Sequence, residues 1–148
     1  MPTESEWEVA ARSGQRTAWT FGSDAGLLAD YGWFVENSGK RPQLVAAKPP
    51  GLGGLHDVQG NQYEWVHDWY GRIEGNSVVV DPQGAATSQS RVLRGGSWNS
   101  DAANCRLAFR FTGDPTDRNT FYGFRLALSP SVTSPEAKGA EEKPQADN

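Results

Sequence analysis

Cysteine and histidine are nearly absent from this sequence. Among 148 residues there is one cysteine, Cys105, and the two histidines are His56 and His67. A single cysteine excludes an internal disulfide framework and a structural zinc site built from cysteines. The two histidines also lack the close spacing of a metal-binding helix.

A basic cluster and a long apolar run are missing as well. The chain has 14 Lys and Arg residues against 18 Asp and Glu residues, which gives a formal net charge of −4. Because nucleic-acid affinity comes mainly from the neutralisation of phosphates, this balance argues against a nucleic-acid groove. No stretch reaches the roughly 20 apolar residues that a transmembrane helix needs, so we expect no membrane span.

Aliphatic residues are scarce, whereas aromatic residues are plentiful. Isoleucine occurs once, but there are six tryptophans, four tyrosines and six phenylalanines. Since large rings bury much area each, we expect one core fed mainly by aromatic side chains. The 17 glycines and nine prolines favour an irregular, loop-rich α+β fold over a helical bundle.

Only a few regular elements are expected. Thr3 and Glu6 have the spacing of a capping box, which predicts a helix from Thr3 to a stop at Gly14. Alternating apolar and polar residues predict three half-buried strands, at 64–70, 106–111 and 124–128. We therefore predict an antiparallel sheet with long loops and one flanking helix.

The composition changes at residue 129. From there to residue 148, Pro, Ser, Glu, Lys and Ala dominate the sequence. Because a segment with so little apolar area does not form a core, we predict a domain over 1–128 and a disordered tail over 129–148.

Four sequence phrases stand in a fixed order. They are 2–12 (PTESEWEVAAR), 54–65 (GLHDVQGNQYEW), 91–98 (RVLRGGSW) and 123–127 (GFRLA). Together they resemble the formylglycine-generating enzyme family, also called the sulfatase-modifying factor family. The resemblance implies a C-type-lectin-like fold. It also implies that this sequence is the C-terminal half of such a domain, because members of that family have about as much chain again before the first phrase.

Glycines in two of these phrases are expected to shape the sheet. Gly95 and Gly96 permit positive φ or a close approach of the backbone. Gly123 is predicted to close a turn before the last strand.

The turn at 60–64 is rich in oxygen atoms. Asn61 and Glu64 carry side-chain oxygens, and Gly60 and Gln62 add backbone carbonyls beside them. A hard cation such as calcium takes this mixture of oxygens. In the family resembled, this turn is a calcium site whose ligand positions Asn61 and Glu64 match, which implies a structural calcium ion. The alternative is capping and hydrogen bonding within the turn.

The resemblance also bears on catalysis. The family's oxidase converts a sulfatase cysteine to formylglycine with oxygen and a copper ion held by two thiolates. Here Ser100 stands where the first cysteine would be, and Cys105 lies near the second; Ser97 matches a serine of the family's active-site groove. Because Cu(I) prefers soft thiolates, we expect the copper site and the oxidase reaction to be lost. Cys105 is then a small buried hydrophobe.

Residues 98–122 mix aromatic side chains with Arg, Asn and Asp. Recognition surfaces use rigid rings for area and polar groups for orientation. Some relatives with the implied fold are variable receptor proteins that display a ligand-binding face in this stretch. The candidate ligand-binding residues are Trp98, Asn99, Asp101, Asn104, Arg106, Arg110, Phe121 and Tyr122. The alternative is that the rings are core and the charged residues form a solvated face.

These observations favour a non-catalytic, calcium-stabilised module that binds a protein or small-molecule ligand. Two alternatives stay open. The first is the formylglycine-generating oxidase itself, acting through Cys105, and the second is a degenerate fragment of such an enzyme.

Overall fold

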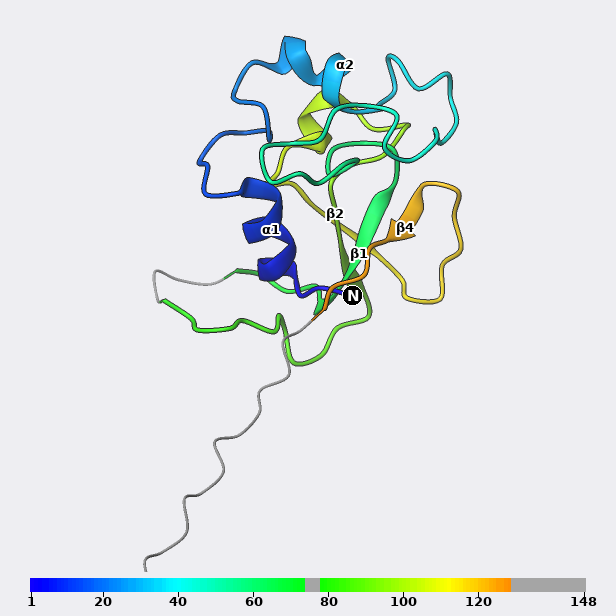
Figure 1. The fold of residues 1–148 in the computed structure, drawn as a ribbon. Coiled ribbons are helices and arrows are strands. Elements are labelled where there is room, and N and C mark those ends of the chain that lie inside the picture. Colours follow the sequence, from blue (N-terminus) through cyan, green and yellow to red (C-terminus); the bar gives the residue numbers. More distant parts are fainter. Residues whose placement is uncertain (74–77, 129–148) are drawn as a thin grey trace, which may run out of the picture.

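The computed structural model describes residues 1–73 and 78–128 of the chain (Figure 1). The tail predicted at 129–148 lies outside the described residues. The elements, in chain order, are α1 (Glu4–Arg12), the 3-10 helix η1 (Ala25–Leu27), α2 (Leu28–Tyr31), β1 (Tyr63–Trp69), β2 (Arg91–Arg94), the 3-10 helix η2 (Ala102–Cys105), β3 (Arg110–Gly113) and β4 (Tyr122–Phe124).

The first helix has the predicted cap. The Glu6 amide donates to Thr3 Oγ1 at 3.2 Å, and the Thr3 amide donates to Glu6 Oε2 at 2.8 Å. Both halves of the capping box are therefore present, which confirms the prediction for the start of α1. The helix ends at Ser13, whose φ of 46° is left-handed, one residue before the predicted stop.

The sheet has four strands in the order β3-β2-β1-β4. The pairs β1–β2 and β2–β3 are antiparallel, as expected, but β4 runs parallel to β1. The expectation of a purely antiparallel sheet is therefore wrong. After β3 the chain passes to the far side of β1, and a strand that arrives there by a crossover runs in the same direction.

Two predicted strands are shorter than the sequence pattern suggested. Leu107 is fully buried and its amide donates to Ala18 O at 2.9 Å, and the Phe109 amide closes a turn onto Arg106. The alternation before β3 therefore comes from a turn and not from a strand. Beyond β4, the side chains of Leu126 and Leu128 are 83% and 96% exposed, so the pattern there does not mark a buried strand either.

The glycine predictions had different outcomes. Gly95 and Gly96 have φ of 91° and 79°, which confirms the expected left-handed backbone. A Cβ on Gly96 would lie 2.6 Å from Cys105 Sγ, so no larger residue fits there. Gly123, however, lies inside β4 and closes no turn, because its neighbours pair with β1 on both sides.

The buried residues form two clusters around the sheet. One cluster joins α1 to β1 and β2 through Trp7, Ala11, Val66, Val92 and others. The second lies under α2 and η2 and contains Trp19, Leu28, Phe34 and Cys105. The first cluster combines one ring with Val and Leu, and the second combines rings with Leu28 and Cys105, so the core is less dominated by aromatic residues than the composition suggested.

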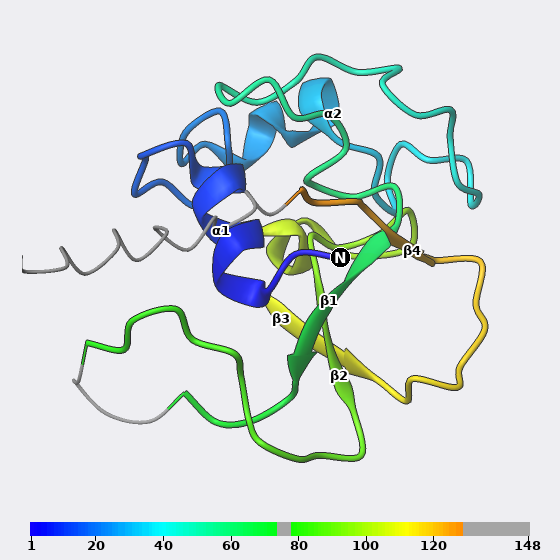
Figure 2. The same cartoon turned by 60° about the horizontal axis from the view of Figure 1, so that its bottom comes forward.

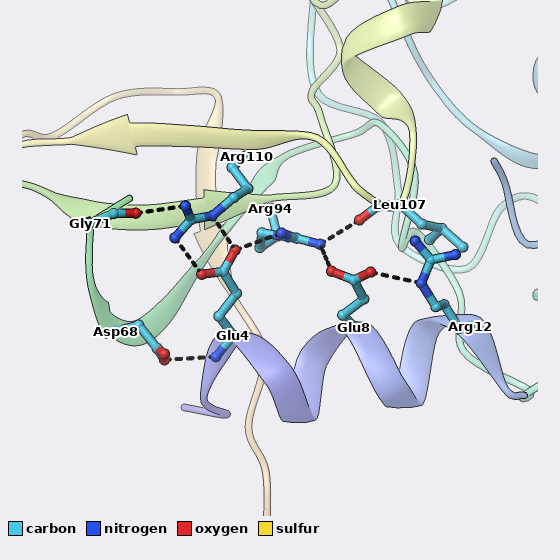
Figure 3. A network of polar contacts seen from close by, with 8 residues as sticks. All are labelled: Glu4, Glu8, Arg12, Asp68, Gly71, Arg94, Leu107 and Arg110. Atoms are coloured by element: carbon cyan, nitrogen blue, oxygen red, sulfur yellow. Dashed lines mark hydrogen bonds and ion pairs between the residues drawn. The ribbon is translucent and has the colours of Figure 1, made fainter. Parts of the chain in front are cut away.

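An ion-pair network ties α1 to the sheet (Figure 3). Glu4 accepts hydrogen bonds from Arg94 at 2.6 Å and from Arg110 at 2.7 Å, and Glu8 accepts from Arg94 at 2.6 Å. Arg94 is only 1% exposed, and Asp68 Oδ2 accepts from the Glu4 amide at 2.7 Å. This network fixes the direction of the helix across β1, β2 and β3.

Candidate functional site

The segment after β2 carries a buried cluster of hydroxyl groups. Ser100 Oγ accepts from the Ser97 amide at 3.0 Å and lies 3.0 Å from Ser97 Oγ. The same oxygen donates to the Tyr63 hydroxyl at 3.1 Å. Ser97 is fully buried and Ser100 is 6% exposed, so the hydroxyl at position 100 is enclosed and has protein partners.

Cys105 lies next to this cluster, at the end of η2. Its side chain is fully buried in the cluster that contains Trp19 and Phe34. Burial raises the pKa of the Cys105 thiol to about 12, and the charge of Asp101 adds to the rise. The thiol is therefore protonated at neutral pH and has the character of a structural cysteine.

These residues do not fit a copper ion. Cu(I) is held by thiolates, and this segment offers one buried thiol, Cys105, and a hydrogen-bonded serine, Ser100, where the resemblance implies a cysteine. Within residues 1–73 and 78–128, no group of three or more His, Cys, Asp or Glu side chains is placed to hold a metal ion.

The turn at 60–64 is tied to the loops on either side. Asn61, with a left-handed φ of 60°, accepts through Oδ1 from the Gln43 amide at 2.9 Å. Its Nδ2 donates to Gln43 O at 3.3 Å, and its carbonyl accepts from the Trp98 amide at 2.8 Å. Gly60 donates its amide to Gly95 O at 2.8 Å. The turn thus links the phrase at 54–65 to the Gly-Gly-Ser phrase at 91–98.

Glu64 is held from two directions. Its Oε2 accepts from Trp7 Nε1 at 2.6 Å, and both of its oxygens accept from the guanidinium of Arg125. The Arg125 guanidinium also donates to His56 O at 3.1 Å. Glu64, Arg125 and Asn61 line one hollow of about 410 Å³ with Asp57 and Gln62.

The oxygen atoms that line this hollow are the type of ligand that a hard cation prefers, but the charge of Glu64 is already neutralised by Arg125. Asn61 Oδ1 likewise has a backbone donor. A calcium ion at this turn therefore requires Arg125 to leave Glu64. The calcium prediction at Asn61, Glu64, Gly60 and Gln62 stays a prediction.

Three of the candidate ligand-binding residues come together beside β4. Trp98 Nε1 donates to Thr120 O at 3.3 Å, which brings this indole to the loop before β4. The rings of Phe121 and Tyr122 meet edge to face with centroids 4.7 Å apart, and Tyr122 meets Trp65 in the same way at 5.2 Å. These rings are half-buried, so they are neither core nor freely exposed.

Four polar candidates surround η2. Asn99 Oδ1 accepts from Ser97 Oγ at 2.6 Å, and Asp101 precedes η2 as an exposed cap residue. Asn104 is half-buried within η2, and Arg106 is exposed and donates through Nε to a carbonyl oxygen of η2 at 2.8 Å. These contacts are local, and they leave the charges of Asp101 and Arg106 facing solvent.

Arg110 lies apart from the other candidates. Its guanidinium binds Glu4 and donates to Gly71 O at 2.8 Å, on the side of the sheet that α1 covers. The structure therefore does not bring Arg110 together with Tyr122, whose neighbour in register is Tyr63. The reason is the two-residue repeat of a strand, which sends residue 110 to one face and residue 111 to the other.

Two aromatic residues of this region, Tyr63 and Trp65, were missed by the sequence analysis. Tyr63 stacks on Phe111 with centroids 4.9 Å apart, and Trp65 contacts Tyr122. The signal was available: odd-numbered residues of β1 share one face of the sheet, and three of them, Tyr63, Trp65 and Trp69, are aromatic.

Comparisons with known proteins agree with the resemblance. The family model described as "Sulfatase-modifying factor enzyme 1-like domain" matches residues 1–130. The chain therefore belongs to the formylglycine-generating enzyme (sulfatase-modifying factor) family. Its fold is the family's mixed α+β fold, with few helices and a small curled sheet.

The chain is similar to proteins that carry different names. The chain is 38% identical over 136 residues to the serine/threonine-protein kinase pkn1 of Chlamydia pneumoniae, and 35% identical over 153 residues to the formylglycine-generating enzyme of Streptomyces coelicolor. These alignments cover 86% and 93% of this chain. A solved structure, Treponema denticola variable protein 1, matches 84% of the chain with 39% identity and a TM-score of 0.80.

The chain spans only part of each relative. It covers 20% of the kinase, 49% of the formylglycine-generating enzyme and 45% of the variable protein. Within the described residues, no helix is both long and apolar enough to cross a membrane.

Proposed function

We propose that this chain is a non-catalytic binding module of the formylglycine-generating enzyme family. Its ligand is a protein or a small molecule, and its binding face is the aromatic region around Trp98, Phe121 and Tyr122. The observation that carries the proposal is the state of the two copper positions. One is a serine hydrogen-bonded to Tyr63, and the other is a fully buried thiol.

The physical chemistry of Cys105 supports this proposal. A nucleophilic or metal-binding cysteine reacts as its thiolate and lies in an accessible, electropositive environment. Burial and the negative charge of Asp101 act in the opposite direction here, because both raise the pKa of Cys105. A copper ion at this position would also lack a second thiolate.

The surface around β4 supports the binding part of the proposal. Half-buried rings with exposed polar neighbours are typical of recognition surfaces. The similarity to a solved variable protein is consistent with such a role.

Calcium belongs to the proposal as its structural cofactor. The ion would bind at Asn61 and Glu64 with backbone oxygens of Gly60 and Gln62, in exchange for the contact between Arg125 and Glu64. Its contribution would be to hold the turn that joins β1 to the Gly-Gly-Ser segment.

An oxidation assay tests the proposal against the oxidase alternative. The full chain is loaded with Cu(I) and incubated under oxygen with a cysteine-containing sulfatase peptide, and formylglycine is measured by mass spectrometry. We expect none. Formylglycine that is lost in Cys105→Ser but kept in the neighbouring control Asn104→Ala would establish the oxidase and refute the proposal.

A further inference from the structure

The sheet has one face that α1 does not cover. Strand register places Tyr63 beside Tyr122 and Trp65 beside Phe124, on the face opposite to Glu64. We call Tyr63, Trp65, Phe111, Tyr122 and Phe124 the aromatic face. Figure 2 shows α1 beside β1 and the loop after β3 extending away from the helix.

The rings of this face are accessible to different degrees. Phe124 is 66% exposed and Phe111 is 37% exposed, whereas Trp65 and Tyr122 are half-buried and Tyr63 is buried. Phe111 stacks on Tyr63 and Tyr122 meets Trp65 edge to face, so two contacting ring pairs lie on this face of the sheet, and the register adds Phe124 beside Trp65. Large clustered apolar surfaces of this kind mark interaction sites.

Exposed aspartates outnumber exposed arginines in the segments that border the aromatic face, with Asp101, Asp114 and Asp117 against Arg106 and Arg118. Asp117 is exposed and lies near Tyr122, whose pKa is raised by burial and by this carboxylate. Asp101 is exposed and acts in the same direction on Tyr63. The nearest arginine of β3, Arg110, is bound to Glu4 on the other face, so it does not offset them.

Cations already lie over rings elsewhere in this chain. The Arg91 guanidinium lies 4.0 Å from the centroid of Trp69, and Lys48 Nζ lies 4.1 Å from the centroid of Trp33. The π face of a ring attracts a cation, and a carboxylate close by adds to that attraction. The aromatic face offers both features, and no described cation occupies it.

We infer that the aromatic face binds a basic segment of a partner protein, with a Lys or Arg side chain over the rings of Tyr122 and Phe124 and close to Asp117. This inference rests on the proposed function and specifies its ligand. Complementary charge would steer the partner to this face, and an acidic segment would be repelled by Asp101 and Asp117.

Peptide titrations of the isotopically labelled full chain, followed by NMR, test the inference. The probes are a short peptide of alternating lysine and leucine and two counterparts in which glutamate or glutamine replaces lysine. We expect only the basic peptide to shift the signals of the aromatic face, and added salt to weaken it. Asp117→Asn should weaken binding about fivefold, the range of one cation–π or ion-pair contact.

Matched variants separate this effect from misfolding. Asp114→Asn removes a carboxylate of the same loop that is bound to Thr116 and does not act on Tyr122, so it should bind the basic peptide like the wild type. Tyr122→Phe keeps the ring and should also bind, whereas Tyr122→Ala should not.

The outcomes also separate this inference from the proposed function. Equal binding of the acidic or the neutral peptide, lost in Tyr122→Ala, would overturn the inference but keep a binding function at this face. Equal losses in Asp114→Asn and Asp117→Asn, or no binding of the basic peptide, would overturn the inference. The oxidation assay tests the non-catalytic role independently of these peptide-binding results.

Discussion

At the scale of single residues, the serine at position 100 and the enclosure of Cys105 have the largest chemical consequence. Both are close to the Gly-Gly-Ser phrase. The Cys105 thiol packs directly against Gly96, where a side chain would have no room. Sequence alone identified the serine and the lone cysteine. It did not reveal that Ser100 is part of a hydroxyl cluster with Ser97 and Tyr63, because that cluster joins residues far apart in the chain.

Thiol reactivity follows from the same environment. Because burial raises the pKa of Cys105 to about 12, the fraction of thiolate at neutral pH is very small. We expect a thiol-reactive disulfide reagent to label the native chain far more slowly than the chain unfolded in urea. Rapid, complete labelling of the native protein at neutral pH would contradict the assigned burial.

The pair between Glu64 and Arg125 gives a second prediction at this scale. Glu64→Gln leaves the Arg125 guanidinium partly enclosed without its counter-charge. We expect the free energy of unfolding in calcium-free buffer to fall by about 2 kcal/mol, as for partly buried hydrogen-bonded charges. Glu36→Gln, the same substitution at an exposed carboxylate, serves as the control and should change the free energy of unfolding little.

At the scale of elements, α1 is the piece that sequence predicted best. Its cap depends on two residues three apart, and such local signals are readable without knowledge of the fold. The strands were predicted less well. Nothing local distinguishes the turn at Leu107 from a strand, because its amide bonds to Ala18 O and its side chain packs in the cluster that contains Trp7, both far back in the chain. The direction of β4 was likewise set by the crossover.

The network under α1 is expected to contribute strongly to stability. Arg94→Met would leave Glu4 and Glu8 without the buried cation that joins them, and we expect a loss of about 3–5 kcal/mol in the free energy of unfolding. Arg12→Met removes a partly exposed pair with Glu8 and one hydrogen bond to Thr17 O, and it should cost less than Arg94→Met, about 1 kcal/mol. Urea titrations of both variants provide the comparison.

Asp68 adds a pH dependence to this element. Burial is the main cause that raises its pKa above 3.8, so the folded state holds this proton more tightly than the unfolded state. Its contribution to stability therefore falls as the pH rises from about 3.8 through the raised value. Asp68→Asn should remove this slope in urea titrations at acidic pH while its amide oxygen still accepts from Glu4. An unchanged slope would contradict the assignment.

At the scale of the whole molecule, two clusters of buried residues and a four-stranded sheet form the part of the family fold that this chain contains. The family and the fold class were predictable because four phrases in order carry them. The binding face was only partly predictable. The sequence indicated Trp98, Phe121 and Tyr122, but the contribution of β1 required the register between strands far apart in the chain.

Thermal unfolding followed by near-ultraviolet circular dichroism tests the whole fold, because six tryptophans report on packing. We expect a cooperative transition whose midpoint rises when calcium is added to the chelated protein, and no such rise in Glu64→Gln. An unshifted wild-type midpoint would remove calcium from the proposed function.

We propose that this chain lacks copper chemistry. The most direct test of this proposal is a Cu(I) titration of the reduced full chain in competition with a chromophoric chelator, under anaerobic conditions. We expect the chelator to keep its copper at every protein concentration and Cys105→Ser to give the same curve. Transfer of one copper per chain to the wild type, abolished in Cys105→Ser, would contradict the proposal.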